Sequence, residues 1–241
     1  KKEEVVDDIT SREPSPIAKP VADPVKEAWK DGVVKIKLDP GHGWNYNQGI
    51  VKSYFEGNQM IYLSYYLQQE LESYGFYVEN TRMPKEEYES AYDALLAEKA
   101  YAASIKKSSI NNDIISLADR GQSAAGFDLL LSLHSNAPFN ISASELWDSV
   151  TSPNKELAKK FLQTVIDTFG HGNRGVKYRY TSKGVNWYGI LRNSGATNAM
   201  LIEHGFHTSA ADANKLLNQD FLKKLAKAEA KTLADYYGLS K

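Results

Sequence analysis

DLLLSLHSN, at Asp128–Asn136, is a near-continuous apolar run that ends in polar residues. It lacks the alternation of a strand with one solvated face, and is typical of a central strand that helices cover on both faces. Such strands build the parallel or mostly parallel sheets of α/β proteins. His134 falls at the carboxyl end of the run, where open α/β sheets bind their ligands. The run therefore predicts a class of fold and the edge of the sheet that carries a site.

The preceding residues indicate a strand, a loop, a helix and a second strand in succession. VVKIKLD (Val33–Asp39) alternates apolar and polar side chains before PGHG ends the strand, so His42 lies just beyond its carboxyl end. Residues Glu56–Tyr74 repeat apolar side chains at steps of three and four, which predicts an amphipathic helix. FYVENTR (Phe76–Arg82) follows as a strand. This order is that of a right-handed crossover between parallel strands.

The rest of the chain supplies further helices and strands around the same sheet. We therefore predict a single α/β domain, residues 31–241, with a twisted, mostly parallel sheet flanked by helices on both faces. Residues 1–30 are expected to form a linker or N-terminal arm that follows a lost module, because four prolines interrupt a stretch of mixed charge. We expect two helices or one broken helix in residues 84–126, a helix at Asn154–Phe169, a Gly-rich turn at GHGNRG, strands at Tyr188–Arg192 and Ala199–Glu203, and two helical stretches between Ala210 and Tyr237.

Composition narrows the partners of this domain. The chain has 241 residues, which suits one substantial domain with an appendage. Lys and Arg number 29 against 30 Asp and Glu, with no long block of like charge, so we expect no nucleic acid partner. No run approaches the roughly 18 apolar residues of a membrane span, so we expect no membrane insertion. The absence of Cys leaves His, Asp and Glu as metal ligands. We expect a monomer.

Two imidazoles and two carboxylates fall where one edge of the sheet would gather them. His42 and His134 follow predicted strands, and Glu203 ends another. Glu56 opens a helix four residues before Met60 and shares its inward face. Catalytic zinc usually takes three nitrogen or oxygen ligands, lowers the pKa of a bound water to about 7, and works with a second carboxylate that moves protons. Spacing alone does not say which carboxylate would bind metal.

Each of these residues also has a structural interpretation. His134 could be a buried histidine that hydrogen bonds satisfy. Glu56 could be a first-turn acidic residue that the helix dipole stabilises. Glu203 could be the buried partner of Arg82 or Arg120, because a polar group directly after an apolar run is costly without a partner. Their common placement at one edge favours the metal site.

Four further polar residues lie in or near the same segments. Asn136 either holds substrate through its amide or caps the loop after the strand. His171, in the Gly-rich turn, is assigned to a loop outside the site. For His204 and His207 a structural role is the preferred interpretation, and hydrogen bonding to the metal ligands is the functional alternative.

Five blocks follow one another along the chain: LDPGHGWNYNQG, Glu56 at the head of its helix, NTR, LLLSLHSNA and AMLIEHGFHTSAADANKLL. In order, spacing and residue type they resemble the signature blocks of the zinc-dependent N-acetylmuramoyl-L-alanine amidases, from about Lys35 to Tyr237. The resemblance implies the type 3 amidase fold, Zn²⁺ held by His42, Glu56 and His134, and Glu203 as the catalytic acid/base.

Three departures from the family pattern stand out. His204 follows Glu203 where the family often carries a small or hydroxyl residue, and His207 adds another imidazole nearby. Residues 83–112 are longer and more helical than the equivalent connection in compact members, which suggests a wall or lid over the site. No long insertion after His134 resembles the inhibitory helix of some division amidases, so we expect no activation by withdrawal of such a helix.

The resemblance implies an autolysin-like, secreted hydrolase that acts on peptidoglycan or muropeptides outside the cytoplasm or in the cell wall. The bond would be the amide between N-acetylmuramic acid and the first L-alanine of the stem peptide. Metal-assisted amide hydrolysis follows from the residues themselves, whereas the bond follows from the resemblance. Two alternatives use the same residues: a zinc carboxypeptidase or endopeptidase that cuts within a peptide, and a catalytically silent wall-binding module.

Overall fold

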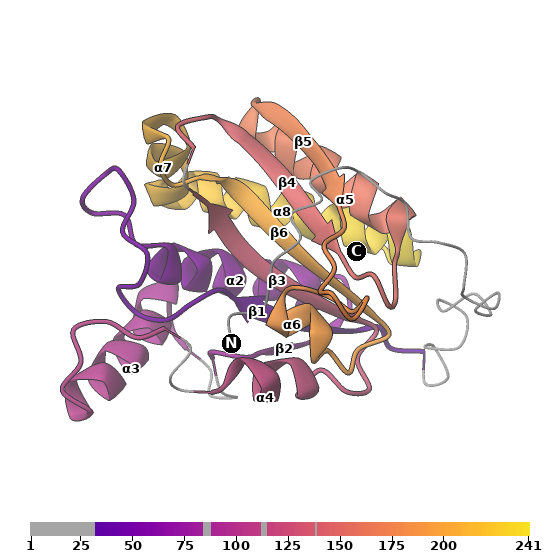
Figure 1. Cartoon of the computed structure of the whole chain (residues 1–241), viewed down its shortest axis with the longest axis horizontal. Helices are drawn as coiled ribbons and strands as arrows, with labels where there is room; N and C mark the ends of the chain where they lie inside the picture. Colours follow the sequence, from indigo (N-terminus) through magenta and orange to yellow (C-terminus); the bar gives the residue numbers. More distant parts are fainter. Residues whose placement is uncertain (1–31, 84–87, 112–114, 138) are drawn as a thin grey trace.

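A six-stranded sheet forms the centre of the part of the chain that the computed structural model describes, residues 32–83, 88–111, 115–137 and 139–241 (Figure 1). The strand order is β2-β1-β3-β6-β4-β5. The four pairs β2/β1, β1/β3, β3/β6 and β4/β5 are parallel, and β4/β6 is antiparallel. The mostly parallel sheet confirms the predicted fold class. The strands are β1 (Lys35–Pro40), β2 (Tyr77–Asn80), β3 (Leu129–Asn136), β4 (Ala143–Asp148), β5 (Gly172–Lys177) and β6 (Asn198–Phe206).

Helices cover both faces of the sheet, as the apolar run of β3 predicts. One face packs against α2, α5 and α8, and the other against α4 and α6, while α3 packs on α2. None of the helices in the described ranges is both long and apolar enough to cross a membrane. The helices are α2 (Glu56–Glu72), α3 (Ala91–Ser104), α4 (Leu117–Gln122), α5 (Lys155–Phe169), α6 (Gly189–Arg192), α7 (Ala210–Leu217) and α8 (Gln219–Tyr237).

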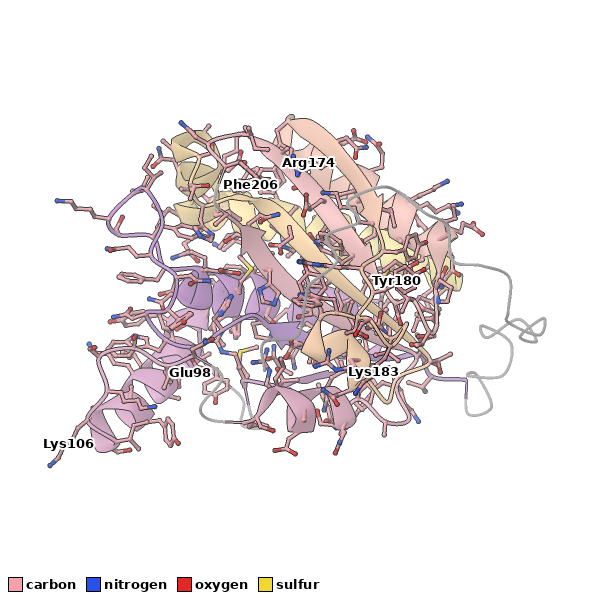
Figure 2. All side chains as sticks on the ribbon, viewed as in Figure 1. Glu98, Lys106, Arg174, Tyr180, Lys183 and Phe206 are labelled. Atoms are coloured by element: carbon pink, nitrogen blue, oxygen red, sulfur yellow. The ribbon has the colours of Figure 1, made fainter. Side chains whose placement is uncertain are left out.

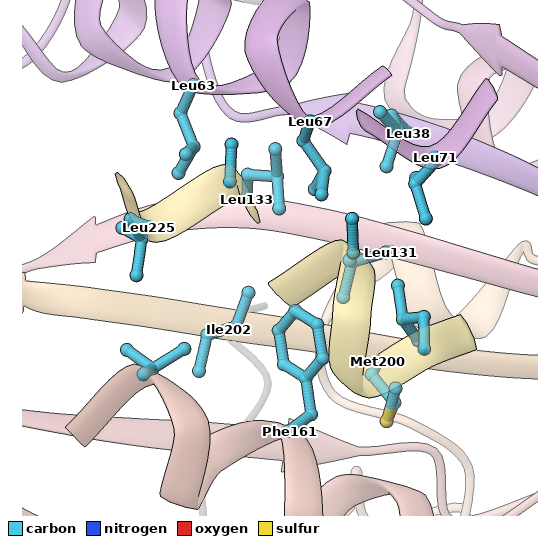
Figure 3. Packing of buried hydrophobic residues seen from close by; sticks show 14 of the residues in the cluster. Leu38, Leu63, Leu67, Leu71, Leu131, Leu133, Phe161, Met200, Ile202 and Leu225 are labelled. Atoms are coloured by element: carbon cyan, nitrogen blue, oxygen red, sulfur yellow. The ribbon is translucent and has the colours of Figure 1, made fainter. Parts of the chain in front are cut away.

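The larger apolar core lies between the sheet and the helices α2, α5 and α8. Figure 3 shows Leu131 and Leu133 of β3 facing Leu67 of α2, with Ile202 of β6 near Phe161 of α5. All five side chains are fully buried. Successive residues of a strand point to opposite faces, so His134 and Glu203 emerge on the other face of the sheet.

Two predicted elements are wrong, and one strand was not anticipated. Tyr188–Arg192 is not a strand: Gly189–Arg192 forms the single turn of α6. Both edges of β6 are already paired, with β3 and β4, so no edge is left beside it for another strand. The Gly-rich turn at GHGNRG is largely the strand β5. The strand that was not anticipated is β4. Its polar and apolar residues do not alternate, and almost all of them are buried.

Candidate metal and catalytic site

Three of the four predicted residues meet at the carboxyl edge of the sheet. His42 lies in the loop after β1, Glu56 is the first residue of α2, and His134 is near the end of β3. Each offers one ligand atom, and these atoms lie within 4.8 Å of one another. Glu56 Oε1 is 3.0 Å from His134 Nδ1, and Glu56 Oε2 is 3.4 Å from His42 Nε2. The inward phase predicted for Glu56 is confirmed, because its side chain is buried.

Two glycines permit this close approach of loop, helix and strand. A Cβ atom on Gly41 would lie 2.3 Å from the ring of His134, and one on Gly57 would lie 1.8 Å from the carbonyl oxygen of Gly43. Neither distance is compatible with a side chain. His42 itself has a positive φ of 59°, a strained backbone conformation for a residue with a Cβ. The PGHG sequence thus turns the chain tightly enough to bring His42 back over the end of β3.

A buried guanidinium holds the His42 loop and the start of α2 together. Arg82, just after β2, donates through Nη1 to the carbonyl oxygens of Gly41 at 3.0 Å and Gly57 at 2.9 Å. These residues adjoin His42 and Glu56 in the sequence. Glu98 of α3 binds the Nε and Nη2 atoms of Arg82, and both side chains are buried. The NTR block therefore has a positioning role, and its partner comes from the helical region at residues 83–112.

Hydrogen bonds orient the ring of His42. Its Nδ1 is 3.0 Å from Asn111 Oδ1, which only accepts, so Nδ1 carries the hydrogen and Nε2 presents a lone pair. Asn47 Nδ2 is 3.0 Å from that Nε2 and donates to Glu56 Oε2 at 2.8 Å. The lone pairs of the imidazole and the carboxylate therefore converge on one point, which a hydrogen-bond donor can satisfy. A cation suits the same point.

The charges of this cluster favour cation binding. Burial alone would raise the pKa of Glu56, but His42, His134 and His207 outweigh it and lower the pKa to about 2. The carboxylate therefore stays ionised at neutral pH, and the backbone N–H of Ser135 donates to its Oε1 at 3.0 Å. Burial lowers the pKa of His42, with partial compensation by Glu56, so its ring is neutral and free to bind a metal.

Glu203 lies beside this cluster but does not belong to it. In the sheet register it is opposite His134 of β3 on one side and Glu145 of β4 on the other. Burial, together with the charges of Glu56 and Glu145, raises its pKa well above the usual range. Its Oε2 is buried and has no hydrogen-bond partner among the described residues. Such a carboxyl group is suited to hold a proton and release it to a substrate.

The structural alternative for Glu203 is wrong. Neither arginine proposed as its partner occupies that role, because Glu98 binds Arg82 and Asp39 binds Arg120. Arg120 Nε donates to Asp39 Oδ1 at 2.7 Å, and Thr81 and Ser132 also donate to this buried carboxylate. These bonds fix the end of β1 just before the His42 loop.

Glu145 is a further polar residue of the site that the sequence did not indicate. Arg174 Nε donates to its Oε2 at 2.6 Å, and Lys177 Nζ donates to the same oxygen at 2.5 Å. Asn136 Nδ2 donates to its Oε1 at 2.9 Å, while Asn136 Oδ1 accepts from the N–H of Ala137. Both ends of the Asn136 amide are therefore used within the chain, as its loop-capping interpretation requires. A substrate contact by Asn136 stays a prediction.

His204 and His207 are buried supports of the strands that carry the site. His204 donates from Nδ1 to the backbone oxygen of His134 at 3.1 Å, and its Nε2 is 2.7 Å from Glu229 Oε1 of α8. His207 Nδ1 is 3.0 Å from the backbone oxygen of Ser135 and 3.9 Å from Glu56 Oε2. The contacts with the backbone oxygens of His134 and Ser135 both hold the end of β3.

His171 precedes β5 and lies outside the candidate site, as predicted, but its side chain is buried. It is 3.3 Å from Asp212 Oδ1 and 2.9 Å from Ser144 Oγ. Ser144 accepts from the N–H of Gly205, and Asp212 accepts from the N–H of Phe206. The cluster therefore satisfies backbone groups where β6 departs from its regular register with β3, just after Glu203.

Fold and site together define an α/β protein with a candidate hydrolytic metal centre at the carboxyl edge of its sheet. Comparison with known proteins gives the family. A family model described as N-acetylmuramoyl-L-alanine amidase matches residues 36–235. The sporulation-specific N-acetylmuramoyl-L-alanine amidase of Bacillus subtilis (strain 168) is 28% identical over 212 residues, which span 87% of this chain and 70% of that protein.

Solved structures share the fold. The N-acetylmuramoyl-L-alanine amidase from Clostridium difficile 630 superposes with a TM-score of 0.63 at 22% identity, over 85% of this chain and 96% of that one. The catalytic domain of CwlV, an amidase from Bacillus (Paenibacillus) polymyxa var. colistinus, gives a TM-score of 0.60 at 17% identity, over 86% of this chain and 100% of that one. The chain belongs to the N-acetylmuramoyl-L-alanine amidase family, which confirms the resemblance found in the sequence blocks.

Proposed function

We propose that this chain hydrolyses the amide between the lactyl group of N-acetylmuramic acid and the first L-alanine of the peptidoglycan stem. The observation that carries the proposal is the convergence of His42, Glu56 and His134 beside Glu203 in a chain whose family is named for this reaction. Water adds to the carbonyl carbon, the carbon–nitrogen bond breaks, and the L-alanine nitrogen leaves as an amino group.

The donor set fits zinc. Two imidazoles and one ionised carboxylate form one of the ligand sets known for catalytic zinc, and their ligand atoms already lie within 4.8 Å of one another. We assign Zn²⁺ to His42, Glu56 and His134. When bound there, the metal would polarise the substrate carbonyl and lower the pKa of a water molecule. Asn47, which now donates to two of the ligands, would have to turn its amide away.

Glu203 is assigned the proton transfers. Glu203 is the register partner of His134 on the neighbouring strand, and adjacent strands of a sheet lie about 4.8 Å apart. Its buried Oε2 has no partner among the described residues, which supports a role in proton transfer. With a cation bound nearby to offset the effect of Glu56 and Glu145 on its pKa, Glu203 would take a proton from the attacking water and return it to the departing nitrogen. Glu56, whose two oxygens are engaged by imidazoles, Asn47 and Ser135, lacks that freedom.

The test of the proposal is the identity of the bond that is cut. The zinc-loaded protein is incubated with purified peptidoglycan, and the new chain ends are labelled and sequenced. We expect free amino groups on the stem L-alanine and intact muramic acid on the glycan. New ends inside the stem would instead establish a carboxypeptidase or endopeptidase, and wall binding without any new ends would establish a silent binding module.

We extend the proposal to the organisation of the protein. Residues 31–241 would be the catalytic domain, and the family match over residues 36–235 supports this boundary. The arm at residues 1–30 lies outside the described residues and stays a prediction, as does a lid at residues 83–112, of which 84–87 and 112 are also outside. We propose action on the wall outside the cytoplasm, by a monomer, which light scattering of the purified protein would check.

A further inference from the structure

The segment between the carboxylates Asp167 and Glu203 is the most one-sidedly charged part of this otherwise balanced chain. It contains no Asp or Glu and five cationic side chains, whereas the whole chain has 29 cations and 30 carboxylates. Three of these cations, Arg174, Lys177 and Arg179, lie on or directly after the edge strand β5. The excess of positive charge is therefore placed on the strand two positions away from β6 in the sheet, which carries Glu203.

The strand order sets out the site as a linear series of groups. His42 and His134 follow β1 and end β3, Glu203 is on β6, Glu145 on β4, and the cations are on β5. Glu145 and Glu203 are register partners, and the cations contact Glu145 directly. From the metal ligands outward, the sheet therefore presents a proton donor, one buried carboxylate and then at least two cations.

Glu145 does not neutralise the charge of both cations or occupy all of their hydrogen-bond donors. Both Arg174 and Lys177 bind the same Oε2, so two positive charges meet one negative charge. The two terminal nitrogens of Arg174 and the remaining protons of Lys177 have no acceptor among the described residues. Arg174 is about one-third exposed at 33% and Lys177 is 21% exposed, against 4% for Glu145. Both cations thus keep donors that a ligand can reach.

Aromatic rings hold the cations in place along this row. The guanidinium of Arg174 lies 5.5 Å from the centre of the Phe206 ring, at the site end of β6 (Figure 2). Lys177 Nζ lies 5.3 Å from the centre of the Trp147 ring. Arg179 stacks on Trp187 at 4.5 Å, farther along the same strand direction. Rings and long side chains that are already ordered lose less entropy when a ligand binds.

The orientation of the substrate in the proposed reaction indicates which part of it the cations of β5 would bind. The acid that protonates the leaving nitrogen must be within hydrogen-bond reach of it, so that nitrogen lies at Glu203. The substrate carbonyl lies toward the ligands on β1 and β3, and the peptide that leaves with the nitrogen continues away from them. On the far side of Glu203 the sheet offers β4 and β5. A peptide carries a carboxylate at its end and at each acidic residue.

We infer that Arg174 and Lys177 bind a carboxylate of the stem peptide and select substrates in which it is free over those in which it is amidated. The inference rests on the proposed amidase function. Charge-assisted hydrogen bonds to a partly exposed carboxylate predict a preference of about tenfold in kcat/KM.

The experiment uses two N-acetylmuramoyl dipeptides that differ only in whether one carboxyl group of the second residue is free or amidated. The ratio of their kcat/KM values is measured in each enzyme. Effects of a substitution on Glu145, on Glu203 or on folding act on both substrates and cancel in this ratio. We expect about tenfold in the wild type, a ratio near one in Arg174→Gln and Lys177→Gln, and recovery in Lys177→Arg, which keeps the charge.

Lys227→Gln is the matched control, because Lys227 is an exposed lysine on α8, which packs on the opposite face of the sheet. It should keep the wild-type ratio. An unchanged ratio in both β5 variants, or equal rates on the two substrates in the wild type, would overturn the inference. Titration calorimetry of the Glu203→Gln protein with each dipeptide compares their dissociation constants without turnover. If the cut falls at another bond, the proposed function fails, while the calorimetric ratio still tests the carboxylate subsite.

Discussion

Glu56 and Glu203 carry the same functional group in opposite surroundings. Glu56 is surrounded by imidazoles and hydrogen-bond donors, and its pKa falls to about 2. Burial and two neighbouring carboxylates raise the pKa of Glu203. The sequence could place both residues at one edge, since helix phase and strand ends are local patterns. It could not separate their roles, because these depend on contacts between residues far apart in the chain.

The two roles predict different losses on substitution by the isosteric amide. Glu56→Gln should lose zinc and activity together, because an amide is a weaker ligand than a carboxylate. Glu203→Gln should keep the wild-type zinc content but lose activity by roughly 10²- to 10⁴-fold, the usual contribution of an acid/base group. Atomic absorption and a muropeptide assay on the same samples measure both. Glu72→Gln, exposed at the end of α2, is the control that should keep both.

At the scale of elements, α3 is tied to the site by one buried ion pair. Glu98 of α3 is 3% exposed and Arg82 is 6% exposed. Glu98→Gln would leave the guanidinium charge buried without a counter-charge, so we expect the free energy of unfolding to fall by about 3 kcal/mol or more. Zinc affinity should fall as well, since Arg82 holds the carbonyls of Gly41 and Gly57. Denaturant unfolding and zinc titration measure the two effects.

An exposed ion pair supplies the comparison for this prediction. Glu156 and Lys160 are neighbours on α5, with side chains 69% and 56% exposed. Glu156→Gln should cause no measurable loss, because solvent screens such pairs. Equal stability of Glu98→Gln and the wild type would contradict the role given to the buried pair.

A buried carboxyl group at the end of β4 predicts a stability that depends on pH. Burial raises the pKa of Asp148 from 3.8 to about 6, despite hydrogen bonds from the backbone of Asn154 and Ser149 and from Tyr178. The folded state therefore holds this proton more tightly than the unfolded state. Its contribution to stability is complete below about pH 4, falls as the pH rises to about 6, and is lost above that value.

Asp148→Asn removes this titration. Between pH 4 and pH 7 the wild type should lose on the order of 2–3 kcal/mol relative to the variant. Urea unfolding at several pH values measures the difference, and other titrating groups cancel because they are common to both proteins. For the control Asp167→Asn, on α5, the free energy of unfolding should vary with pH in parallel with that of the wild type. Parallel curves for Asp148→Asn as well would show that the carboxyl is not buried as described.

Elements with a strong local pattern were predictable, and those defined by tertiary pairing were not. The helix α2 and the central strand β3 have apolar patterns that their own side chains specify. By contrast, β4 and β5 run opposite to the other strands, and β5 contains two glycines and three polar or charged residues. Its place in the sheet depends on pairing with β4. The four residues of α6 are too few to distinguish a buried turn of helix from a strand.

For the whole molecule, the candidate ligands connect distant parts of the chain. Glu56 and His134 are 78 residues apart, and they lie on a helix and a strand that both approach His42 in the loop after β1. The unfolded chain has no such site preformed, so zinc should bind the folded state preferentially and stabilise it. The cross-link would also secure the loop at positive φ, which otherwise relies on Arg82 and the asparagines.

Removing zinc should therefore lower the stability of the whole domain. With free zinc at about a thousandfold above its dissociation constant, the expected loss on chelation is about 4 kcal/mol. Thermal unfolding with and without a chelator, followed by addition of zinc, measures the change and its reversal. His134→Ala should be insensitive to both treatments, whereas Glu203→Gln should respond like the wild type because it keeps all three ligands. A chelator effect that persists in His134→Ala would place the metal at other residues, since the stabilisation would then not pass through β3.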